Sequence, residues 1–328
     1  MKAIVLRRPG QVPAFSYEDL PDPQCKEDEI RILVKAAAVN RGEVQRRAGT
    51  VGGSWSPTSA DPPKPAIVGW DVAGVIDRVG KNVNQNLIGQ RVVALLVERG
   101  GYAEMAVVPS EFAIPIPAHM TFNEAASLPV AFLTSWYGLV RHAGLHAGEV
   151  VLIQAGTSGI GVAGIQIAKD LSAIVIATAG TDDKTEFCKK LGADYVINYT
   201  KEDFLDGVKD ITNNRGVNVA LDCVGGETLK NSIASLSHGG RIVTVGNVSQ
   251  SHHPTIALDI LFKIRPRFAS ESLLTEPDLP SALSNIVQLV AHGRIKAVID
   301  KTFHLSRADE AHNYIEQRQH KGKVILTP

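Results

Sequence analysis

The residues best suited to chemistry form a glycine-rich segment, Ala155–Gly161, in the middle of the chain. This segment directly follows the apolar run Val150–Gln154 and precedes residues with helical periodicity. Glycines in such a turn let the backbone approach a bound group closely, and the N-terminus of the next helix offers free N–H groups and a partial positive charge. A strand, a glycine-rich turn and a helix in this order predict a binding site for the pyrophosphate of a dinucleotide. The residues expected at the phosphates are Thr157, Ser158, Gly159 and Ile160.

The end of the next strand indicates which dinucleotide is bound. In proteins that prefer NAD, this strand usually ends in an acid that binds the ribose 2′-hydroxyl. Here the strand ends Ala177–Thr181 without an acid, and the two aspartates that follow suit the first turn of a helix. Lys184 either reaches a 2′-phosphate or is a solvated helix lysine, and Tyr199 ends the following strand in range of the adenine. We therefore expect NADPH rather than NADH, with Gly180, Lys184 and Tyr199 among the cofactor-binding residues.

Alternating strands and helices position this turn. After residue 122, apolar runs alternate with helices of about ten residues, which predicts an α/β domain with a doubly wound parallel sheet. The runs are Val150–Gln154, Ala173–Thr178, Tyr195–Asn198, Val217–Asp222 and Arg241–Val245. Residues 1 to about 122 are instead short β-rich runs broken by turns, typical of a mostly antiparallel β domain. The length of 328 residues fits two domains.

Composition excludes several classes of protein. The 34 basic residues balance 34 acidic ones, so the chain lacks the basic excess of a general nucleic-acid binder. Its cysteines, Cys25, Cys188 and Cys223, are too few for a disulfide framework or a four-cysteine zinc lobe. The N-terminus reaches charged residues before a signal-peptide core could form, and the longest uncharged run, Val150–Ala168, contains too many glycines for a membrane span. We expect a soluble cytoplasmic protein without a nucleic-acid or membrane partner.

Short stretches along nearly the whole chain match one family pattern in order and spacing. They are Ala38–Arg41, Gly69–Ile76, Gly89–Val92, Gly100–Glu104, Ala125–Pro129, Thr134–Tyr137, Ala155–Gly161, Leu191–Asp194 and Gly239–Arg241. With these residues the chain resembles the medium-chain dehydrogenase/reductase superfamily, specifically its zinc-free quinone oxidoreductase (ζ-crystallin-like) branch. The resemblance implies a GroES-like β domain made of residues 1–122 and 266–328, a Rossmann domain of residues 123–265, and a homodimer formed through the edge of the Rossmann sheet. Short-chain dehydrogenases have a similar turn, but they begin with it and need a Tyr-x-x-x-Lys motif, which is absent here.

The resemblance also bears on metal binding. Zinc alcohol dehydrogenases of the superfamily have a cysteine where Asn40 stands and a histidine where Trp70 stands, and neither replacement is a competent zinc ligand. The resemblance therefore implies a zinc-free enzyme. The histidine pairs His142/His146 and His252/His253 lack nearby cysteine or acid partners in the sequence, and we interpret them as surface residues.

Without a Lewis acid, the family chemistry that remains is hydride delivery from NADPH to an electrophilic small-molecule acceptor. The acceptor expected is a quinone or an α,β-unsaturated carbonyl, an enone or enal. Gln45 stands where several quinone reductases have an aromatic residue. This weakens the case for a quinone, so the quinone and the unsaturated carbonyl are about equally expected as acceptors. The alternatives are an enoyl-thioester (CoA) reductase, a non-catalytic, crystallin-like NADPH-binding protein, and a zinc alcohol dehydrogenase that metal analysis would reveal.

The resemblance assigns further site residues. Asn40 is expected at the nicotinamide and substrate, or else as a loop cap, and Thr134 beside the nicotinamide ribose, or else as a helix hydroxyl bonded to backbone. Val245, Gly246 and Asn247 follow the fifth strand at the expected ligand crevice, where their backbone would approach the nicotinamide. Phe268, Ala269 and Ser270 are expected to contact its carboxamide.

Tryptophans and basic residues complete the candidates. Trp55, Trp70 and Trp136 either wall a flat pocket or pack in the core. Two basic groups recognise the 2′-phosphate or an acidic substrate such as a CoA ester, or are simply solvated charge. They are Lys263, Arg265 and Arg267, expected next to the cleft, and Arg41, Arg46 and Arg47, which follow Asn40.

Overall fold

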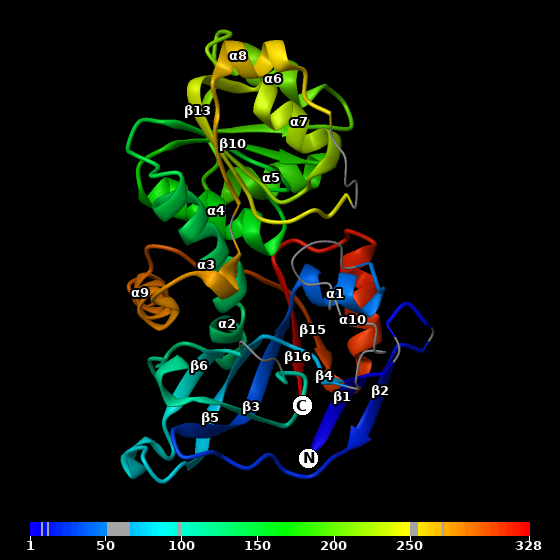
Figure 1. Ribbon diagram of the computed structural model, residues 1–328, viewed down its shortest axis with the longest axis vertical. Coiled ribbons are helices and arrows are strands. Elements are labelled where there is room, and N and C mark those ends of the chain that lie inside the picture. The colour runs from blue at the N-terminus through cyan, green and yellow to red at the C-terminus, as the bar shows by residue number, and fades with distance from the viewer. Residues whose placement is uncertain (8, 12, 51–65, 97–99, 250–254, 271) are drawn as a thin grey trace. The chain divides into compact units, whose positions relative to one another are not determined.

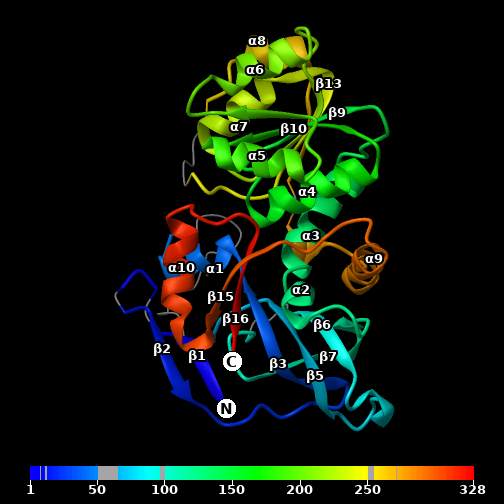
Figure 2. The same ribbon diagram turned by 180° about the vertical axis from the view of Figure 1, so that it is seen from behind.

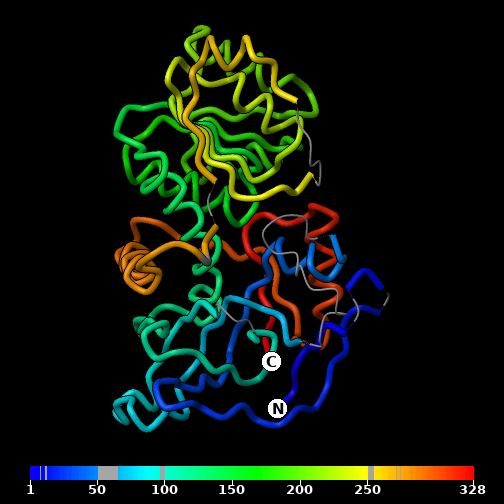
Figure 3. The backbone as a smooth tube through the Cα atoms, in the orientation of Figure 1, coloured from blue at the N-terminus to red at the C-terminus, as the bar shows by residue number. Residues whose placement is uncertain are grey.

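The computed structural model describes residues 1–7, 9–11, 13–50, 66–96, 100–249, 255–270 and 272–328. The chain divides into two compact units, and each unit is made of segments that are separated in the sequence (Figure 3). The β unit comprises Met1–Val130, Pro277–Gly293 and Ala297–Pro328, and the α/β unit comprises Ala131–Glu276 and Arg294–Lys296. The sequence analysis sets the boundaries after residues 122 and 265, whereas the units divide after 130 and 276. Trp55, His252 and His253 lie outside the described residues.

The α/β unit is built on a six-stranded parallel sheet, in the order β11-β10-β9-β12-β13-β14. Its strands are β9 (Val150–Ile153), β10 (Ile174–Ala179), β11 (Tyr195–Asn198), β12 (Val217–Asp222), β13 (Leu236–Thr244) and β14 (Arg267–Ser270). In chain order this is 3-2-1-4-5-6, the arrangement of a Rossmann fold, so the predicted parallel doubly wound sheet is confirmed. The order reverses between β9 and β12, and ligands of such sheets bind at that point, beyond the carboxyl ends of the strands.

Helices connect these strands and cover both faces of the sheet (Figures 1 and 2). Helices α4 (Gly159–Asp170) and α5 (Asp182–Lys190) lie on one face, and α6 (Phe204–Ile211), α7 (Gly226–Ala234) and α8 (Leu258–Ile264) lie on the other. This is the outcome of right-handed crossovers that run outward from β9 in both directions. Helix α3 (Pro129–Trp136) and the π-helix η3 (Tyr137–His142) precede β9.

Strand β14 is an addition to the predicted sheet. The sequence analysis assigns residues from 266 onward to the β domain, whereas Arg267–Ser270 pairs in parallel with β13, from Arg241↔Arg267 to Thr244↔Ser270. The local sequence explains the turn, because Arg265 ends α8 in the left-handed region (φ 52°) and Pro266 cannot continue a helix. The chain therefore returns alongside β13 and becomes the edge strand of the sheet.

The β unit joins both ends of the chain in one seven-stranded sheet, as predicted for a mostly antiparallel domain. Its order is β15-β16-β3-β5-β6-β8, with β7 also paired to β3, and all pairs are antiparallel except β15 with β16. The strands are β3 (Glu29–Val39), β5 (Asp71–Val79), β6 (Arg91–Leu95), β7 (Met105–Pro109), β8 (Ala113–Pro115), β15 (Ile299–His304) and β16 (Lys323–Thr327). The proline-containing strand β8 lies at the sheet edge, where a missing N–H is tolerated.

The remaining elements close the core of the β unit. A small antiparallel sheet of β2 (Phe15–Asp19), β1 (Lys2–Leu6) and β4 (Ala66–Ile67) contributes Ile4, Leu6 and Phe15 to the same hydrophobic cluster as β3 and β16. Helices α1 (Arg41–Arg47), α2 (Phe122–Ala126), α9 (Leu279–Ala291) and α10 (Ala308–Glu316) surround the sheets (Figure 1). Among the described residues, no helix is both long enough and apolar enough to cross a lipid bilayer.

Candidate functional site

The glycine-rich turn has the predicted strand–turn–helix geometry. It leaves β9 at Ile153 and enters α4 at Gly159, and the Ser158 hydroxyl caps the helix by accepting a hydrogen bond from Gly161 N at 3.0 Å. A Cβ at position 161 would lie 2.3 Å from the Ala155 carbonyl oxygen, so only glycine lets the turn close against the helix. The free N–H groups of the first turn of α4 therefore face a narrow glycine cradle, which fits a pyrophosphate group.

A buried hydrogen-bond chain supports this turn from below. Thr178 Oγ1 donates to Gln154 Oε1 at 2.6 Å and accepts from the backbone N–H of Ala155 at 3.2 Å. Gln154 Nε2 donates to Ser232 Oγ (3.0 Å), which donates to Asp222 Oδ2 (2.9 Å). These residues join the carboxyl ends of β9, β10 and β12, so the chain fixes the shape of the crevice edge. The sequence analysis missed this chain, although a polar residue at the end of each of three apolar strands is a readable signal.

Gly180 and Tyr199 meet beyond the ends of β10 and β11. A Cβ at position 180 would lie 2.6 Å from the Tyr199 hydroxyl, so the phenol covers the glycine while remaining 47% exposed. Asp182 is held by Asn198 at 2.8 Å and Lys201 at 2.6 Å, and the Lys201 hydrogen bond lowers the pKa of this carboxyl. Asp182 therefore serves its own helix start, as its position suggests. Lys184 is half-buried two residues further along α5.

Thr134 lies on α3, the helix that contacts the turn through its next residue. The neighbouring Ser135 hydroxyl lies 2.9 Å from the Ile160 carbonyl oxygen, which ties α3 to the start of α4. Thr134 itself is 5% exposed. Trp136, beside it, packs edge-on against Tyr137 with ring centres 5.2 Å apart.

The segment after β13 also reaches the crevice. Val245 N donates to the Asp222 carbonyl oxygen at 2.9 Å, which places this segment beside the end of β12. The Asn247 side chain lies over Gly225, where a Cβ would be 2.3 Å from its Oδ1. In β14, Ser270 is in register with Thr244 at the carboxyl end, whereas Phe268 lies two residues earlier on the open edge and is 57% exposed.

Of the basic group expected beside the cleft, Arg267 lies away from the carboxyl ends of the strands. Arg267 is in register with Arg241 where β13 and β14 run side by side, near the amino end of β14. Ligands of parallel sheets bind at the carboxyl ends, so this arginine pair faces away from the crevice. A cavity of about 290 Å³ lies there instead, lined by Arg141, Arg241 and Arg267 among other residues, and Glu149 neutralises Arg241 at 2.5 Å.

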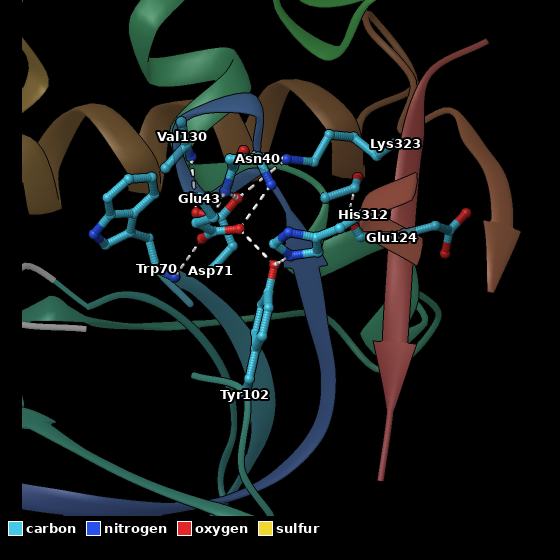
Figure 4. Close-up of polar contacts among 10 residues, drawn as sticks. Asn40, Glu43, Trp70, Asp71, Tyr102, Glu124, Val130, His312 and Lys323 are labelled. Atoms are coloured by element: carbon cyan, nitrogen blue, oxygen red, sulfur yellow. Dashed lines mark hydrogen bonds and ion pairs between the residues drawn. The ribbon is translucent and has the colours of Figure 1, made fainter. Parts of the chain in front are cut away.

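The second candidate region is a buried polar cluster in the β unit (Figure 4). Strand β3 ends at Val39, Asn40 caps α1, and the helix turns Glu43 back so that it accepts from Asn40 N at 2.8 Å. The cluster draws one residue each from the end of β3 (the N-cap of α1), α1, β5, the segment before β7, α10 and β16. Its members are Asn40, Glu43, Asp71, Tyr102, His312 and Lys323, each at most 8% exposed.

The Asn40 amide is engaged at both ends. Its Oδ1 accepts from Lys323 Nζ at 2.5 Å, and its Nδ2 donates to Asp71 Oδ2 at 3.0 Å and to Glu43 Oε1 at 3.4 Å. Lys323 also contacts Asp71 at 3.3 Å. Asn40 occupies the N-cap position of α1, but its amide bonds to other side chains and not to the helix backbone, and its bond to Glu43 is the longest of these.

Glu43 receives four hydrogen bonds. Besides the two from Asn40, Trp70 N donates to its Oε1 at 2.9 Å and the Tyr102 hydroxyl to its Oε2 at 2.6 Å. Burial raises the pKa of Glu43 to about 7, and the nearby Asp71 contributes to this increase. The hydrogen bonds to Glu43 and the charge of Lys323 act in the opposite direction. Tyr102 is linked onward to His312 Nε2 at 3.1 Å, and burial lowers the pKa of that histidine well below its usual value.

These residues do not fit a catalytic zinc ion. The Trp70 ring packs on Gly42, where a Cβ would be 3.1 Å from it, and indole is not a zinc ligand. The Asn40 oxygen faces an ammonium group, which would repel a divalent cation. Within the ranges that the structure describes, no three histidine, cysteine or acidic side chains gather as a metal site, although His142 does pair with Glu276 at 2.7 Å.

The arginines after Asn40 have structural partners. Arg47 contacts Asp309 at 3.1 Å and Glu316 at 2.5 Å, so it binds α1 to α10. Arg41 Nη1 donates to the Ile315 carbonyl oxygen at 3.4 Å in the same helix. Arg47 is thus neutralised by two carboxylates, whereas Arg41 makes one long hydrogen bond and its buried Nε has no partner among the described residues.

Comparisons with known proteins are consistent with this architecture. Residues 26–118 match the family described as alcohol dehydrogenase GroES-like domain, and residues 191–326 match zinc-binding dehydrogenase. Human quinone oxidoreductase is 30% identical over 94% of this chain and 92% of its own length. A 2-haloacrylate reductase from Burkholderia sp. is 29% identical, over 99% and 98%. A phenolphthiocerol/phthiocerol polyketide synthase from Mycobacterium tuberculosis is 29% identical over 98% of this chain, which spans only 14% of that protein.

Solved structures agree with the sequence relatives over the full length of the chain. An NAD-dependent alcohol dehydrogenase superposes with a TM-score of 0.90 at 32% identity, covering 100% of both chains. Escherichia coli quinone oxidoreductase complexed with NADPH gives 0.89 at 30%, also covering 100% of both. CurK enoyl reductase gives 0.88 at 28%, covering 99% of this chain and 98% of that one. With its GroES-like and Rossmann units in this order, the chain belongs to the medium-chain dehydrogenase/reductase superfamily.

Proposed function

We propose that the protein is a zinc-independent, NADPH-dependent oxidoreductase that transfers hydride to a quinone or an α,β-unsaturated carbonyl compound. The observation that carries this proposal is the glycine turn of the α/β unit, where Gly161 leaves no room for a side chain and Ser158 caps the helix. The turn binds the pyrophosphate through backbone N–H groups at the start of α4. NADPH supplies the hydride when bound, and the residues of this chain orient it and keep water away.

Preference for NADPH is supported by the end of β10. Asp182, which begins the next helix, is held by Asn198 and Lys201, so it does not offer a free carboxylate to a ribose 2′-hydroxyl. We propose that Lys184 contacts the 2′-phosphate and Tyr199 the adenine. The Escherichia coli neighbour is described with NADPH, and another neighbour is described as NAD-dependent, so both nucleotides must be compared.

Zinc independence and the acceptor class are supported by the polar cluster and the relatives. Trp70 and the Asn40–Lys323 pair replace a zinc-binding arrangement, so the acceptor oxygen must be stabilised by hydrogen-bond donors and not by a metal ion. Thr134, at the buried end of α3, is the hydroxyl we propose beside the nicotinamide ribose. The names quinone oxidoreductase and 2-haloacrylate reductase both describe reduction of an electron-poor conjugated system.

A second candidate, an enoyl-thioester reductase, is favoured by two relatives. One neighbour is an enoyl reductase, and the match to a polyketide synthase includes almost the whole of this chain. A free thioester substrate such as an enoyl-CoA would extend the acceptor class without changing the hydride step.

The test is oxidation of NADPH and of NADH by the purified protein, followed by nucleotide absorbance, with quinones, enones, enals and enoyl-CoAs as acceptors. We expect turnover with NADPH and at least one of these acceptors. Tight NADPH binding without turnover on any acceptor would instead identify a crystallin-like binding protein. Stoichiometric zinc together with alcohol oxidation would contradict the zinc-independent assignment.

We also propose a homodimer in the cytoplasm. The dimer is supported by the open edge of β14, where Phe268 is 57% exposed, and by the exposed Phe262 (75%) of α8, the helix that precedes this strand. The cytoplasm is supported by three cysteines that are all free thiols. We propose small molecules as its ligands, and neither nucleic acid nor membrane as a partner.

A further inference from the structure

Among the described groups that are hydrogen-bonded to Glu43, only one can accept a proton from it. Asn40 N, Asn40 Nδ2 and Trp70 N can only donate. The Tyr102 hydroxyl is different, because it both donates and accepts. A protonated Glu43 can therefore be satisfied only if it donates to Tyr102 and the phenol turns its own hydrogen elsewhere.

His312 can receive that hydrogen. Its Nε2 lies 3.1 Å from the Tyr102 oxygen, and its Nδ1 is buried without a hydrogen-bond partner in the described part of the chain. A neutral imidazole carries its proton on either nitrogen. With the proton on Nε2, the histidine donates to Tyr102, and with the proton on Nδ1 it accepts from Tyr102.

The three residues thus have two arrangements in which each hydrogen bond between them has one donor and one acceptor. In the first, Glu43 is ionised, Tyr102 donates to it, and His312 Nε2–H donates to Tyr102. In the second, a proton has bound His312 Nδ1, the Nε2 proton has moved to the Tyr102 oxygen, and the original Tyr102 proton has moved to Glu43. One proton is gained from solvent, no group is left charged that was neutral, and both hydrogen bonds reverse direction.

The charges around Glu43 favour uptake of that proton. Asp71 from β5 faces it as a second acid, and Lys323 from β16 supplies one ammonium for the two carboxyl groups. Tyr102 and His312, from the segment before β7 and from α10, are neutral. Arg47 lies on the same helix as Glu43, but Asp309 and Glu316 already neutralise it. An ionised Glu43 therefore leaves one buried negative charge without a cation.

We propose that Glu43, Tyr102 and His312 form a buried relay that takes up one proton at Glu43 and so makes Glu43 a positioning residue for Asn40. A neutral Glu43 holds the Asn40 Nδ2–H only weakly, since this bond is already 3.4 Å long and loses its ionic partner. The amide then keeps its bond to Asp71 and has one N–H free for a ligand oxygen. The link to a substrate rests on the proposed function, whereas the relay itself does not.

The test is ¹⁵N NMR of the histidines of the full-length protein without nucleotide or acceptor. The His312 signals are assigned from their loss in His312→Gln and followed between about pH 5 and about pH 9, which spans the usual range of histidine and raised carboxyl pKa values. We expect the Nε2–H tautomer at high pH and the Nδ1–H tautomer at low pH. The midpoint should coincide with the ¹³C carboxyl titration of Glu43.

Tyr102→Phe keeps the buried ring and removes the relay hydroxyl, so the tautomer change should disappear. Tyr17→Phe, on β2 of the same unit, is the matched control and should leave the change intact. One His312 tautomer throughout the pH range in the unaltered protein, or a change that persists in Tyr102→Phe, would overturn the relay.

The positioning role has its own readout. With an acceptor that turns over, Tyr102→Phe should remove the pH dependence of the acceptor KM in this range and leave NADPH binding as in Tyr17→Phe. An unchanged KM profile with an intact NMR result would overturn the link to Asn40. If the unaltered protein turns over no acceptor, this would count against the proposed function. The NMR test of the relay would remain valid.

Discussion

Lys323 shows how strongly single residues are constrained in the β unit. It is a charged side chain with 5% exposure, and it lies between the Asn40 oxygen and Asp71. Replacing it with methionine keeps most of the volume and leaves Asp71 buried without its cation. Breaking a buried pair from one side costs about 3–5 kcal/mol. We predict a loss of this size for Lys323→Met in urea unfolding.

The control for that variant is Lys35→Met, because Lys35 is exposed on β3 of the same sheet. It should change stability by less than about 0.5 kcal/mol, as surface substitutions usually do. Equal effects of the two substitutions would show that Lys323 is no more than a surface-like charge and that Asp71 finds another partner.

Glu43 gives the β unit a pH-dependent stability with a defined sign. Its pKa is raised from 4.5 to about 7, so between these values the folded state holds a proton that the unfolded state has released. Its contribution therefore favours the folded state at low pH and is lost as the pH rises through about 7. The shift corresponds to roughly 3 kcal/mol over this window.

We predict that Glu43→Gln removes this slope from the stability curve. The variant loses the acceptor for Asn40 N, so it should be less stable overall, but the difference from the unaltered protein should shrink as the pH rises from about 4.5 to about 7. Denaturant unfolding at a series of pH values measures this difference, with the exposed Glu111→Gln as control. A difference that stays constant, or grows, with rising pH would contradict the assignment.

For single residues, the sequence predicts the kind of site more readily than the side chains that a site residue will contact. The glycines of the turn carry their own requirement, because only glycine fits at position 161 whatever lies elsewhere. Lys323 gives no such sign, since its partners stand 252 and 283 residues earlier in the chain. Asn40 was found through a family resemblance, but its engagement by Lys323 depends on pairing β16 with β3, which no local pattern encodes.

At the scale of elements, one side chain at the start of α4 contributes both to the stability of the helix and to the proposed ligand binding. The Ser158 hydroxyl caps this helix, and its removal should cost about 1 kcal/mol of stability. The same hydroxyl is proposed at the pyrophosphate. We predict that Ser158→Ala weakens NADPH binding by about tenfold, the equivalent of one lost hydrogen bond of about 1.4 kcal/mol.

Thr121→Ala separates the two effects. Thr121 caps α2 of the β unit by accepting from Glu124 N at 3.2 Å, so the variant loses a cap hydroxyl of the same kind far from the turn in sequence. It should lose similar stability in thermal unfolding and keep its NADPH Kd in fluorescence titration. Weaker NADPH binding in both variants would mean that general loosening, and not Ser158, accounts for the effect.

Secondary-structure elements can be predicted from the sequence where the pattern is local. The prediction fails where the pairing of distant strands determines the element. The five apolar runs of the parallel sheet are confirmed because each is a buried strand between two helices. Strand β14 is only four residues long, RFAS, with mostly exposed side chains. Its place in the sheet depends on the turn at Arg265 and Pro266. The position of Arg267 could not be predicted for the same reason, because it depends on the pairing of β14 with β13.

The whole molecule presents two open edges in its parallel sheet, and they differ in chemistry. At β11 the exposed large side chains are Tyr195 (45%) and, just beyond, Tyr199 (47%), whose hydroxyls suit water. At β14, Phe268 is 57% exposed, and the preceding helix α8 exposes Phe262 (75%) and Leu258 (68%). None of these side chains has a polar group. Exposed apolar side chains beside an unpaired strand edge mark a surface for association. A second copy of the chain is the partner proposed for β14.

We predict that Phe268→Lys converts the homodimer to a monomer, because a charge at an edge strand opposes pairing with another strand. Light scattering with size-exclusion chromatography measures the mass over a dilution series. Tyr195→Lys on the opposite edge is the matched control and should remain dimeric, and both variants should keep the thermal stability expected of exposed substitutions when compared at the same protein concentration. A monomeric Tyr195→Lys variant beside a dimeric Phe268→Lys variant would place the interface at β11. A monomeric unaltered protein would mean that the apolar side chains of α8 and β14 are not covered by a second copy at all.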